Sequence, residues 1–270
     1  MEYLPKVKIK KSGFSGPNLT IVYCMHGDEK LGEKIADNIF KLKINRGNLT
    51  TVLANPKAYS KNKRFINEDL NRIFPGRSKT YEQKLAKNIL KIVKNTDYLV
   101  DIHATTGKTE PFAIIIKNNP QIINLIKSSG IRNIVLMGKN LASGKSLIDQ
   151  TKNGFSFEYY SKTPKKSLKI GTENIKVLLV GLRMVKEEKQ QEDKLTFYEV
   201  VSVLEKPENF IAKIKFENLS LIKKGTLLGF SKKEPIIADK NFYPIFHGEK
   251  SYPELVCLQA VKRHSFSRLH

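Results

Sequence analysis

The stretch Ile21-Val-Tyr-Cys-Met-His-Gly-Asp-Glu-Lys30 decides how the chain folds. It is an apolar run that stops abruptly at small and polar residues. A short run rich in β-branched and aromatic residues that ends at a glycine is typical of a buried strand and a tight turn. Apolar residues then recur at helical spacing up to Phe40. His26 and Glu29 therefore lie between a strand and a helix, where ligands bind in open α/β sheets.

The same pattern continues on both sides of this stretch. Lysine alternates with apolar residues over 6–11, which predicts an edge strand, and a further strand is predicted over 49–54. The strand–helix–strand order favours a parallel pair joined by a right-handed crossover. Further strands are predicted over 97–103, 112–117, 133–137 and 155–160, with helices over 79–95, 121–129 and 172–185. This alternation predicts an α/β fold.

Two segments interrupt the regular pattern. Residues 55–77 form a long stretch of mostly polar residues, and a loop of this length in a compact domain is usually functional or disordered. Its apolar residues favour an anchored, functional loop. Residues 141–153 contain Ser-Gly-Lys between flanking glycines, which predicts a flexible or lid-like loop.

The charged run 186–194 offers nothing to bury, so we interpret it as a linker. Short β-like segments follow over 196–204, 211–216, 226–230 and 243–246. The sequence therefore predicts two domains, residues 1–190 and a small, mostly-β domain of residues 191–270.

The formal net charge is +22 over 270 residues, which could indicate nucleic acid, an anionic membrane or an acidic substrate as the partner. The lysines are spread through every third of the chain, without the aromatic interleaving of single-strand binders. A lysine-rich solvated surface is the simplest interpretation, and attraction of anionic substrates is the next. We expect no nucleic-acid or membrane partner.

Two cysteines, Cys24 and Cys257, do not make a disulfide framework and agree with a reducing compartment. No apolar run approaches the roughly 18 residues that cross a bilayer, and the first residues lack an apolar signal core. We therefore expect a cytoplasmic protein. Cys24 lies two residues before His26 on a buried strand, where a small core residue is the simpler interpretation.

His26 and Glu29 alone are a weak metal signal, because such a pair at a helix start more often serves capping or surface chemistry. His103, at the end of a second predicted strand, strengthens it. Two histidines and a carboxylate leave one position of tetrahedral zinc open for water. Zinc would lower the pKa of that water toward about 7 and polarise a carbonyl.

A series of motifs between residues 19 and 160 resembles the aspartoacylase and succinylglutamate desuccinylase family. The motifs are His26-Gly-Asp-Glu29, Asn55-Pro-Lys-Ala58, Arg64, Asp69-Leu-Asn-Arg-Ile-Phe-Pro-Gly76, Asp101-Ile-His-Ala-Thr105 and Glu158. The stretch Tyr243–Tyr252 is similar to the C-terminal segment of the aspartoacylase branch. The resemblance implies a zinc carboxypeptidase-like fold, in which a mixed central sheet has helices on both faces.

The resemblance also implies roles for individual residues. One zinc ion per chain would be held by His26, Glu29 and His103. Glu158 would be the general base that takes a proton from zinc-bound water and later passes it to the leaving amine. Arg64 would stabilise the oxyanion that develops on the amide carbonyl. Without the resemblance, Glu158 and Arg64 would be interpreted as ordinary solvated side chains.

Asn71 and Arg72 would bind the substrate carboxylate, and Tyr252 would complete that pocket from the C-terminal domain. Each also has a simpler interpretation, solvation for the arginine and packing for the tyrosine. Glu249 of the same C-terminal segment would be supporting structure. Asp101 shares a strand face with His103, so it could either orient that ligand or serve a structural role.

The sequence departs from the family at three points, one of which is Tyr159-Tyr160, where a small pair such as Val-Gly usually follows the catalytic glutamate. Asp28 stands where the family usually has asparagine. Aspartoacylases carry a substrate-binding arginine shortly before the catalytic glutamate, whereas this chain has no arginine between Arg132 and Arg183. Lys145 could replace it as a point charge, although lysine and arginine differ at a bidentate site.

The sequence thus predicts an aspartoacylase-like zinc enzyme that hydrolyses the amide of a small anionic N-acyl amino acid. A carboxypeptidase-like hydrolase of short peptides or other carboxylate-bearing amides remains an alternative. A basic nucleic-acid or membrane-binding protein with a vestigial metal site is the alternative from another class. The sequence leaves a homo-oligomer open.

Overall fold

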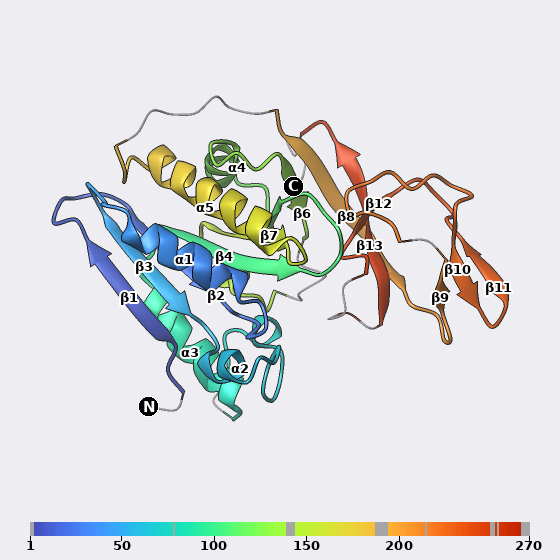
Figure 1. Cartoon of the computed structure of the whole chain (residues 1–270), viewed down its shortest axis with the longest axis horizontal. Coiled ribbons are helices and arrows are strands. Elements are labelled where there is room, and N and C mark those ends of the chain that lie inside the picture. Colours follow the sequence, from blue (N-terminus) through green and yellow to red (C-terminus); the bar gives the residue numbers. More distant parts are fainter. Residues whose placement is uncertain are drawn as a thin grey trace.

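The computed structural model describes residues 3–77, 79–138, 144–186, 194–213, 215–248, 252 and 254–265. Within these residues a mixed sheet forms the centre of the molecule (Figure 1). In sheet order its strands are β1 (Lys6–Lys11), β3 (Asn48–Leu53), β2 (Asn18–Tyr23), β4 (Tyr98–Thr105), β7 (Gly154–Tyr160), β5 (Phe112–Ile115), β6 (Asn133–Leu136), β8 (Thr196–Glu205), β13 (Leu255–Arg263) and β12 (Tyr243–Ile245).

Four neighbouring strands at the middle of this sheet, β3, β2, β4 and β7, run parallel. Their carboxyl ends therefore lie at one edge of the sheet, which is where the polar residues after β2 and β4 occur. The lysine-rich β1 pairs with β3 in antiparallel orientation at the outer edge, as its alternating pattern predicts. β5 runs antiparallel to β7, which makes the sheet mixed.

Helices cover both faces of the sheet because neighbouring strand residues point to opposite sides. Ile21 of β2 packs in one core with α1 (Leu31–Lys41), α4 (Pro120–Lys127) and α5 (Pro164–Gly181). Val22 packs in a second core with α3 (Tyr81–Val93) on the other face. The predicted α/β architecture is confirmed.

Several element boundaries differ from the expectation. α5 begins at Pro164, eight residues before the predicted start at 172. The sequence pattern misses this start because the first turns of the helix are polar and lack a clear apolar stripe. Residues 55–77 contain α2 (Pro56–Ser60) and the short helix η1 (Leu70–Arg72), which the sequence pattern missed. Part of the predicted lid-like loop lies outside the described residues. Its remainder contains η2 (Ile148–Gln150) and buries Leu147 and Ile148.

The chain after residue 194 contributes to two sheets. β8 pairs in parallel with β6 and is followed in the central sheet by β13 and β12. A smaller sheet contains β9 (Ile211–Ala212), β10 (Leu227–Ser231) and β11 (Glu234–Ile237). The small β sheet is thus as expected, whereas strands from both sides of residue 190 share the central sheet. The two-domain division stays a prediction.

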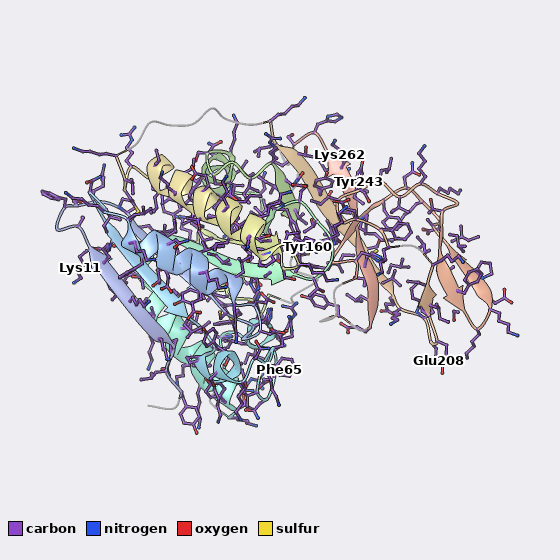
Figure 2. The ribbon with its side chains drawn as sticks, viewed as in Figure 1. Lys11, Phe65, Tyr160, Glu208, Tyr243 and Lys262 are labelled. Carbon is purple, nitrogen blue, oxygen red and sulfur yellow. The ribbon has the colours of Figure 1, made fainter. Side chains whose placement is uncertain are left out.

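The outer surface carries lysines over the whole length of the molecule. Lys11 on the β1 edge and Lys262 on β13 are two exposed examples that lie far apart (Figure 2). This distribution agrees with a solvated surface rather than one concentrated basic patch. Among the described residues, none of the helices has the length and apolar character needed to span a bilayer.

Candidate active site

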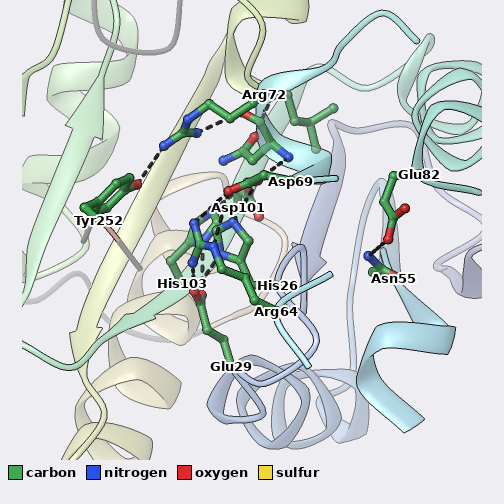
Figure 3. A network of polar contacts seen from close by, with 12 residues as sticks. His26, Glu29, Asn55, Arg64, Asp69, Arg72, Glu82, Asp101, His103 and Tyr252 are labelled. Atoms are coloured by element: carbon green, nitrogen blue, oxygen red, sulfur yellow. Dashed lines mark hydrogen bonds and ion pairs between the residues drawn. The ribbon is translucent and has the colours of Figure 1, made fainter. Parts of the chain in front are cut away.

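A buried carboxylate organises the loop that follows β3. Glu82 of α3 is fully buried and accepts hydrogen bonds from the backbone nitrogens of Ile66 and Asn67, at 2.7 and 3.1 Å. It also accepts one from Nδ2 of Asn55, at 3.3 Å (Figure 3). These bonds fix both ends of the segment that carries Arg64 and lead it toward η1. Sequence reasoning missed Glu82, because a glutamate in the first turn of a helix usually faces solvent.

Three potential metal ligands converge at the carboxyl ends of β2 and β4. The Nδ1 atoms of His26 and His103 lie 2.6 and 3.1 Å from the two carboxylate oxygens of Glu29. One ligand atom from each residue lies within 4.8 Å of the others. The backbone nitrogen of Ala104 donates to Oε2 of Glu29 at 3.0 Å, which holds this carboxylate at the end of β4. The structure therefore brings together the predicted ligand set.

The outer nitrogen of each histidine faces a second carboxylate. Nε2 of His103 lies 2.8 Å from Oδ2 of Asp101, and Nε2 of His26 lies 3.2 Å from Oδ1 of Asp69 (Figure 3). Such contacts fix the tautomer and ring orientation of a metal-binding histidine. Asp101 is fully buried and contacts the ligand, which supports the orienting role over a purely structural one.

The electrostatics of this cluster stabilise positive charge at its centre. Burial alone would lower the pKa of His103, but Asp101 and Glu29 raise it well above the ordinary value. Burial alone would raise the pKa of Glu29, but the two histidines lower it well below its usual range. Two imidazoles and a carboxylate with a cation-stabilising surround match the donor set of a catalytic zinc site, which keeps one position open. The residues present thus fit the metal.

Gly27 allows the turn between His26 and Glu29 to pass directly against α2. A Cβ atom there would lie 2.2 Å from the backbone carbon of Ala58 and from the nitrogen of Tyr59. The nitrogen of Gly27 also donates to the carbonyl oxygen of Arg64 at 3.1 Å. The glycine between His26 and Glu29 therefore serves close approach of two backbone segments.

We expect Gly27→Ala to weaken both stability and metal binding, because the added methyl group must push α2 away from the turn. The free energy of unfolding should fall by about 1–3 kcal/mol, as for other overpacked sites. Urea unfolding and zinc content after dialysis would measure the two effects. Gly181→Ala at the end of α5, where the new methyl would meet only a serine side chain closely, is the control. Unchanged stability and zinc content would show that the close approach is not required.

Arg64 lies beside the cluster of His26, Glu29 and His103, as the resemblance implies. Its Nη2 donates to Oδ2 of Asp69 at 2.8 Å, and its Nη1 lies 3.5 Å from Oε1 of Glu29. Asp69 thereby joins Arg64 to His26, and it also accepts a bond from the backbone nitrogen of Asn71 at 2.9 Å. The predicted motif contained Asp69, but its bridging role was missed because only the fold shows which groups its two oxygens meet.

Arg72 and Tyr252 form a pair above the pocket. Nη2 of Arg72 donates to the Tyr252 hydroxyl at 2.7 Å (Figure 3). The Tyr252 ring centroid lies 5.7 Å from the guanidinium carbons of both Arg64 and Arg72. Burial raises the pKa of Tyr252, which keeps the hydroxyl neutral. Residues 180 positions apart thus meet at one site.

Glu158 lies next to His103 on the neighbouring strand. The parallel register of β4 and β7 sets it directly beside His103. Both residues line a cavity of about 170 Å³, together with His26, Asn71, Arg72 and Tyr252. Glu158 is 6% exposed, so it is a pocket residue rather than an acid that faces bulk water.

The sequence of this chain matches a known protein family. Residues 15–184 match the succinylglutamate desuccinylase/aspartoacylase catalytic domain. The chain belongs to this family. A "probable aspartoacylase" from Nostoc sp. is 34% identical over 86 residues, which cover 28% of this chain and 29% of that relative. The matched segment is thus under a third of the relative's length.

Several solved structures share the fold over nearly the whole chain. Murine aminoacylase 3 has a TM-score of 0.75 at 18% identity, covering 92% of this chain and 96% of its own. Succinylglutamate desuccinylase from Vibrio cholerae has a TM-score of 0.76 at 18% identity, covering 96% and 87%. An aspartoacylase family protein from Mesorhizobium loti has a TM-score of 0.74 at 20% identity, covering 96% and 89%.

The remaining residues that the sequence predicted near the site differ in burial and in their contacts. Asn71 is buried, and its Oδ1 accepts a bond from the backbone nitrogen of Leu147 at 3.0 Å. Only the amide nitrogen end of Asn71 is thus left to face a substrate. Lys145 is exposed, and it is not among the described residues that line the pocket. Glu249 lies outside the described residues. Cys24 is fully buried, as a core residue should be.

An asparagine anchors the C-terminal segment that carries Tyr252. Asn218 is buried, and its Oδ1 accepts a bond from the nitrogen of His247 at 2.8 Å. Its Nδ2 donates to the carbonyl oxygen of Lys108 at 3.2 Å, in the loop after β4. Gly107 in that loop has no room for a Cβ, which would lie 2.1 Å from the oxygen of His247. No local pattern indicates these contacts, because Lys108 and Asn218 lie 110 positions apart in the chain.

We expect Asp101→Asn to lower zinc affinity by about 10–100-fold. The change removes the Asp101 carboxylate that orients His103 but keeps the shape of the side chain. Competition with a chelator would measure the change. Asp37→Asn, which alters a surface pair with Lys8, is the matched control. Equal affinities in the two variants would contradict an orienting role for Asp101.

Proposed function

We propose that this chain is a zinc-dependent amidohydrolase that removes the acyl group from a small N-acyl amino acid. The observation that carries the proposal is that three groups of residues meet at one cavity. These are the His26, Glu29 and His103 cluster, the adjacent Glu158, and the Arg72–Tyr252 pair. Family membership supports hydrolysis of an amide over the alternative of a binding protein with a vestigial site.

His26, Glu29 and His103 would hold the zinc ion. When bound, zinc lowers the pKa of water toward neutrality and polarises a carbonyl. Asp101 and Asp69 would keep the two imidazoles oriented. This arrangement leaves the side of the cluster that faces the cavity open to substrate.

Glu158 would move the proton. It lies beside His103, on the same side of the sheet, and in the cavity. From there its carboxylate would accept the proton of the attacking water and donate it to the amine as the amide bond breaks. General acid–base work of this kind contributes roughly 10²–10⁴-fold to a rate.

Arg64 would donate to the oxyanion that forms on the amide carbonyl. Asp69 holds its Nη2 and Nε, at 2.8 and 3.3 Å, so the guanidinium has a fixed orientation at the edge of the cluster. A donor that is fixed before the reaction stabilises developing charge without reorganisation.

Arg72, with Tyr252 and the amide nitrogen of Asn71, would bind the carboxylate of the amino acid. Arg72 is held from both sides, because its Nη1 donates to the carbonyl oxygen of Asn71 at 2.9 Å and its Nη2 to Tyr252. A planar guanidinium suits bidentate binding of a carboxylate. The site would thus bind a small anionic substrate.

Turnover of an N-acyl amino acid panel by the zinc-loaded protein tests the proposal. The panel contains N-acetyl-aspartate, N-succinyl-glutamate, N-acetyl-methionine and short dipeptides. Release of free amino acid, lost on chelation and restored by zinc, would support a deacylase. Exclusive cleavage of dipeptides would favour the carboxypeptidase-like alternative, and no cleavage of any amide would contradict the proposal.

Arg72→Lys tests the carboxylate site in the same assay. A lysine keeps the charge but loses the planar fork and the bond to Tyr252, so we expect KM to rise by about 10-fold or more. Arg263→Lys, at an exposed pair with Glu199, is the control. Equal KM values in the variants would remove Arg72 from the substrate site.

A further inference from the structure

The part of the cavity beyond Glu158 is lined by apolar side chains. Ile114, Ile116, Met137, Ile148, Phe246 and Leu258 all line it. They come from five places in the chain: β5 and its end, the end of β6, η2, the segment after β12, and β13. Four of them are at most 9% exposed, so this wall is part of the packed core.

The order of the strands determines where this wall lies. β4 carries His103, β7 carries Glu158, and β5, β6, β8 and β13 follow in that order. Ile114 of β5 is directly opposite Ser156 of β7, which shares a strand face with Glu158. The cavity floor thus passes from the metal cluster over Glu158 to the apolar wall.

Apart from Glu254, an exposed residue just before β13, the charged side chains of the cavity lie at its end near His26 and His103. Among the described residues that line it, the one arginine or lysine is Arg72, and its guanidinium is bound to Tyr252 and Asn71. A substrate with one carboxylate would pair it with Arg72. A second carboxylate placed against the wall would meet no lysine or arginine among the described residues that line the cavity, and burial of an unpaired charge strongly disfavours binding.

We infer that the amino acid released by this enzyme carries an apolar side chain, such as that of methionine, leucine or phenylalanine. This rests on the proposed deacylase function and specifies its substrate class. Glu158 must reach the leaving amine, and Arg72 binds the carboxylate of the same amino acid, so its side chain lies beyond Glu158 against the apolar wall.

The kcat/KM values for N-acetyl-methionine, N-acetyl-leucine, N-acetyl-aspartate and N-acetyl-glutamate test the inference on the unmodified, zinc-loaded protein. We expect the apolar substrates to be preferred by about 100-fold or more. Preference for the acidic substrates would overturn the inference while leaving the deacylase proposal standing.

Equilibrium binding separates the inference from the proposed function. Calorimetric titration of the Glu158→Gln protein with N-acetyl-methionine and N-acetyl-aspartate measures the pocket without turnover. If no substrate is hydrolysed by the unmodified protein, the deacylase proposal fails. Binding of N-acetyl-methionine that is at least 10-fold tighter would still support the apolar pocket, and equal or weaker binding would overturn it.

Ile116→Arg introduces a cation into the wall. Ile116 is half-buried just beyond β5, so the change is tolerated better there than within the strand. We expect the ratio of kcat/KM for apolar over acidic substrates to fall by about 10-fold. Val201→Arg adds the same charge at an exposed position of β8 outside the cavity and should leave the ratio unchanged. An unchanged ratio in a folded Ile116→Arg protein would overturn the inference that the side chain of the substrate contacts this wall.

Discussion

Glu158→Gln is expected to lower kcat by about 10²–10⁴-fold while zinc content stays stoichiometric. The amide keeps the shape of the side chain but cannot accept the proton of the attacking water or return it to the amine. Because Glu158 is not among the three converging ligand residues, the metal site should remain intact. Steady-state kinetics and metal analysis on the same preparation would measure both quantities.

Glu234→Gln is the matched control for this change, because Glu234 is exposed on β11 and does not line the cavity. It should have the kinetics of the unmodified protein. Full activity of Glu158→Gln would remove Glu158 from the proton transfer. Loss of zinc together with activity would instead assign it to the metal site.

His103→Ala is expected to abolish both stoichiometric zinc binding and turnover. The change removes one of three converging ligand atoms, and it leaves the fully buried Asp101 carboxylate without its histidine partner. A buried carboxylate that loses its partner is costly, so we also expect a drop of about 3–5 kcal/mol in the free energy of unfolding. Zinc analysis after dialysis and urea unfolding would measure these effects.

His264→Ala provides the control, since His264 is exposed at the end of β13. It should keep zinc, activity and stability. Retention of stoichiometric zinc and activity by His103→Ala would contradict the proposed ligand set. Loss of zinc with unchanged stability would contradict only the coupling between His103 and the buried Asp101.

The elements of the fold were predictable where packing leaves a local pattern. β2 and β4 are buried on both faces and consist mainly of apolar residues, while α1 and α3 show a clear apolar stripe. The first turns of α5 lack such a stripe, and its start was therefore placed too late. Strand β13, which joins the C-terminal segment to the central sheet, was not predicted at all, because its pairing with β8 is a long-range contact.

The sequence by itself determined the chemistry available to this protein. Histidine, glutamate and arginine occur in the family's motifs, and the strand ends on which His26 and His103 lie are marked by local patterns. Tertiary structure alone decided what surrounds them. It brought Tyr252 to Arg72, gave His26 and His103 their carboxylate partners Asp69 and Asp101, and placed apolar side chains beyond Glu158. The physical reason is that residue type fixes what a side chain can bind, whereas burial and distance fix what it meets.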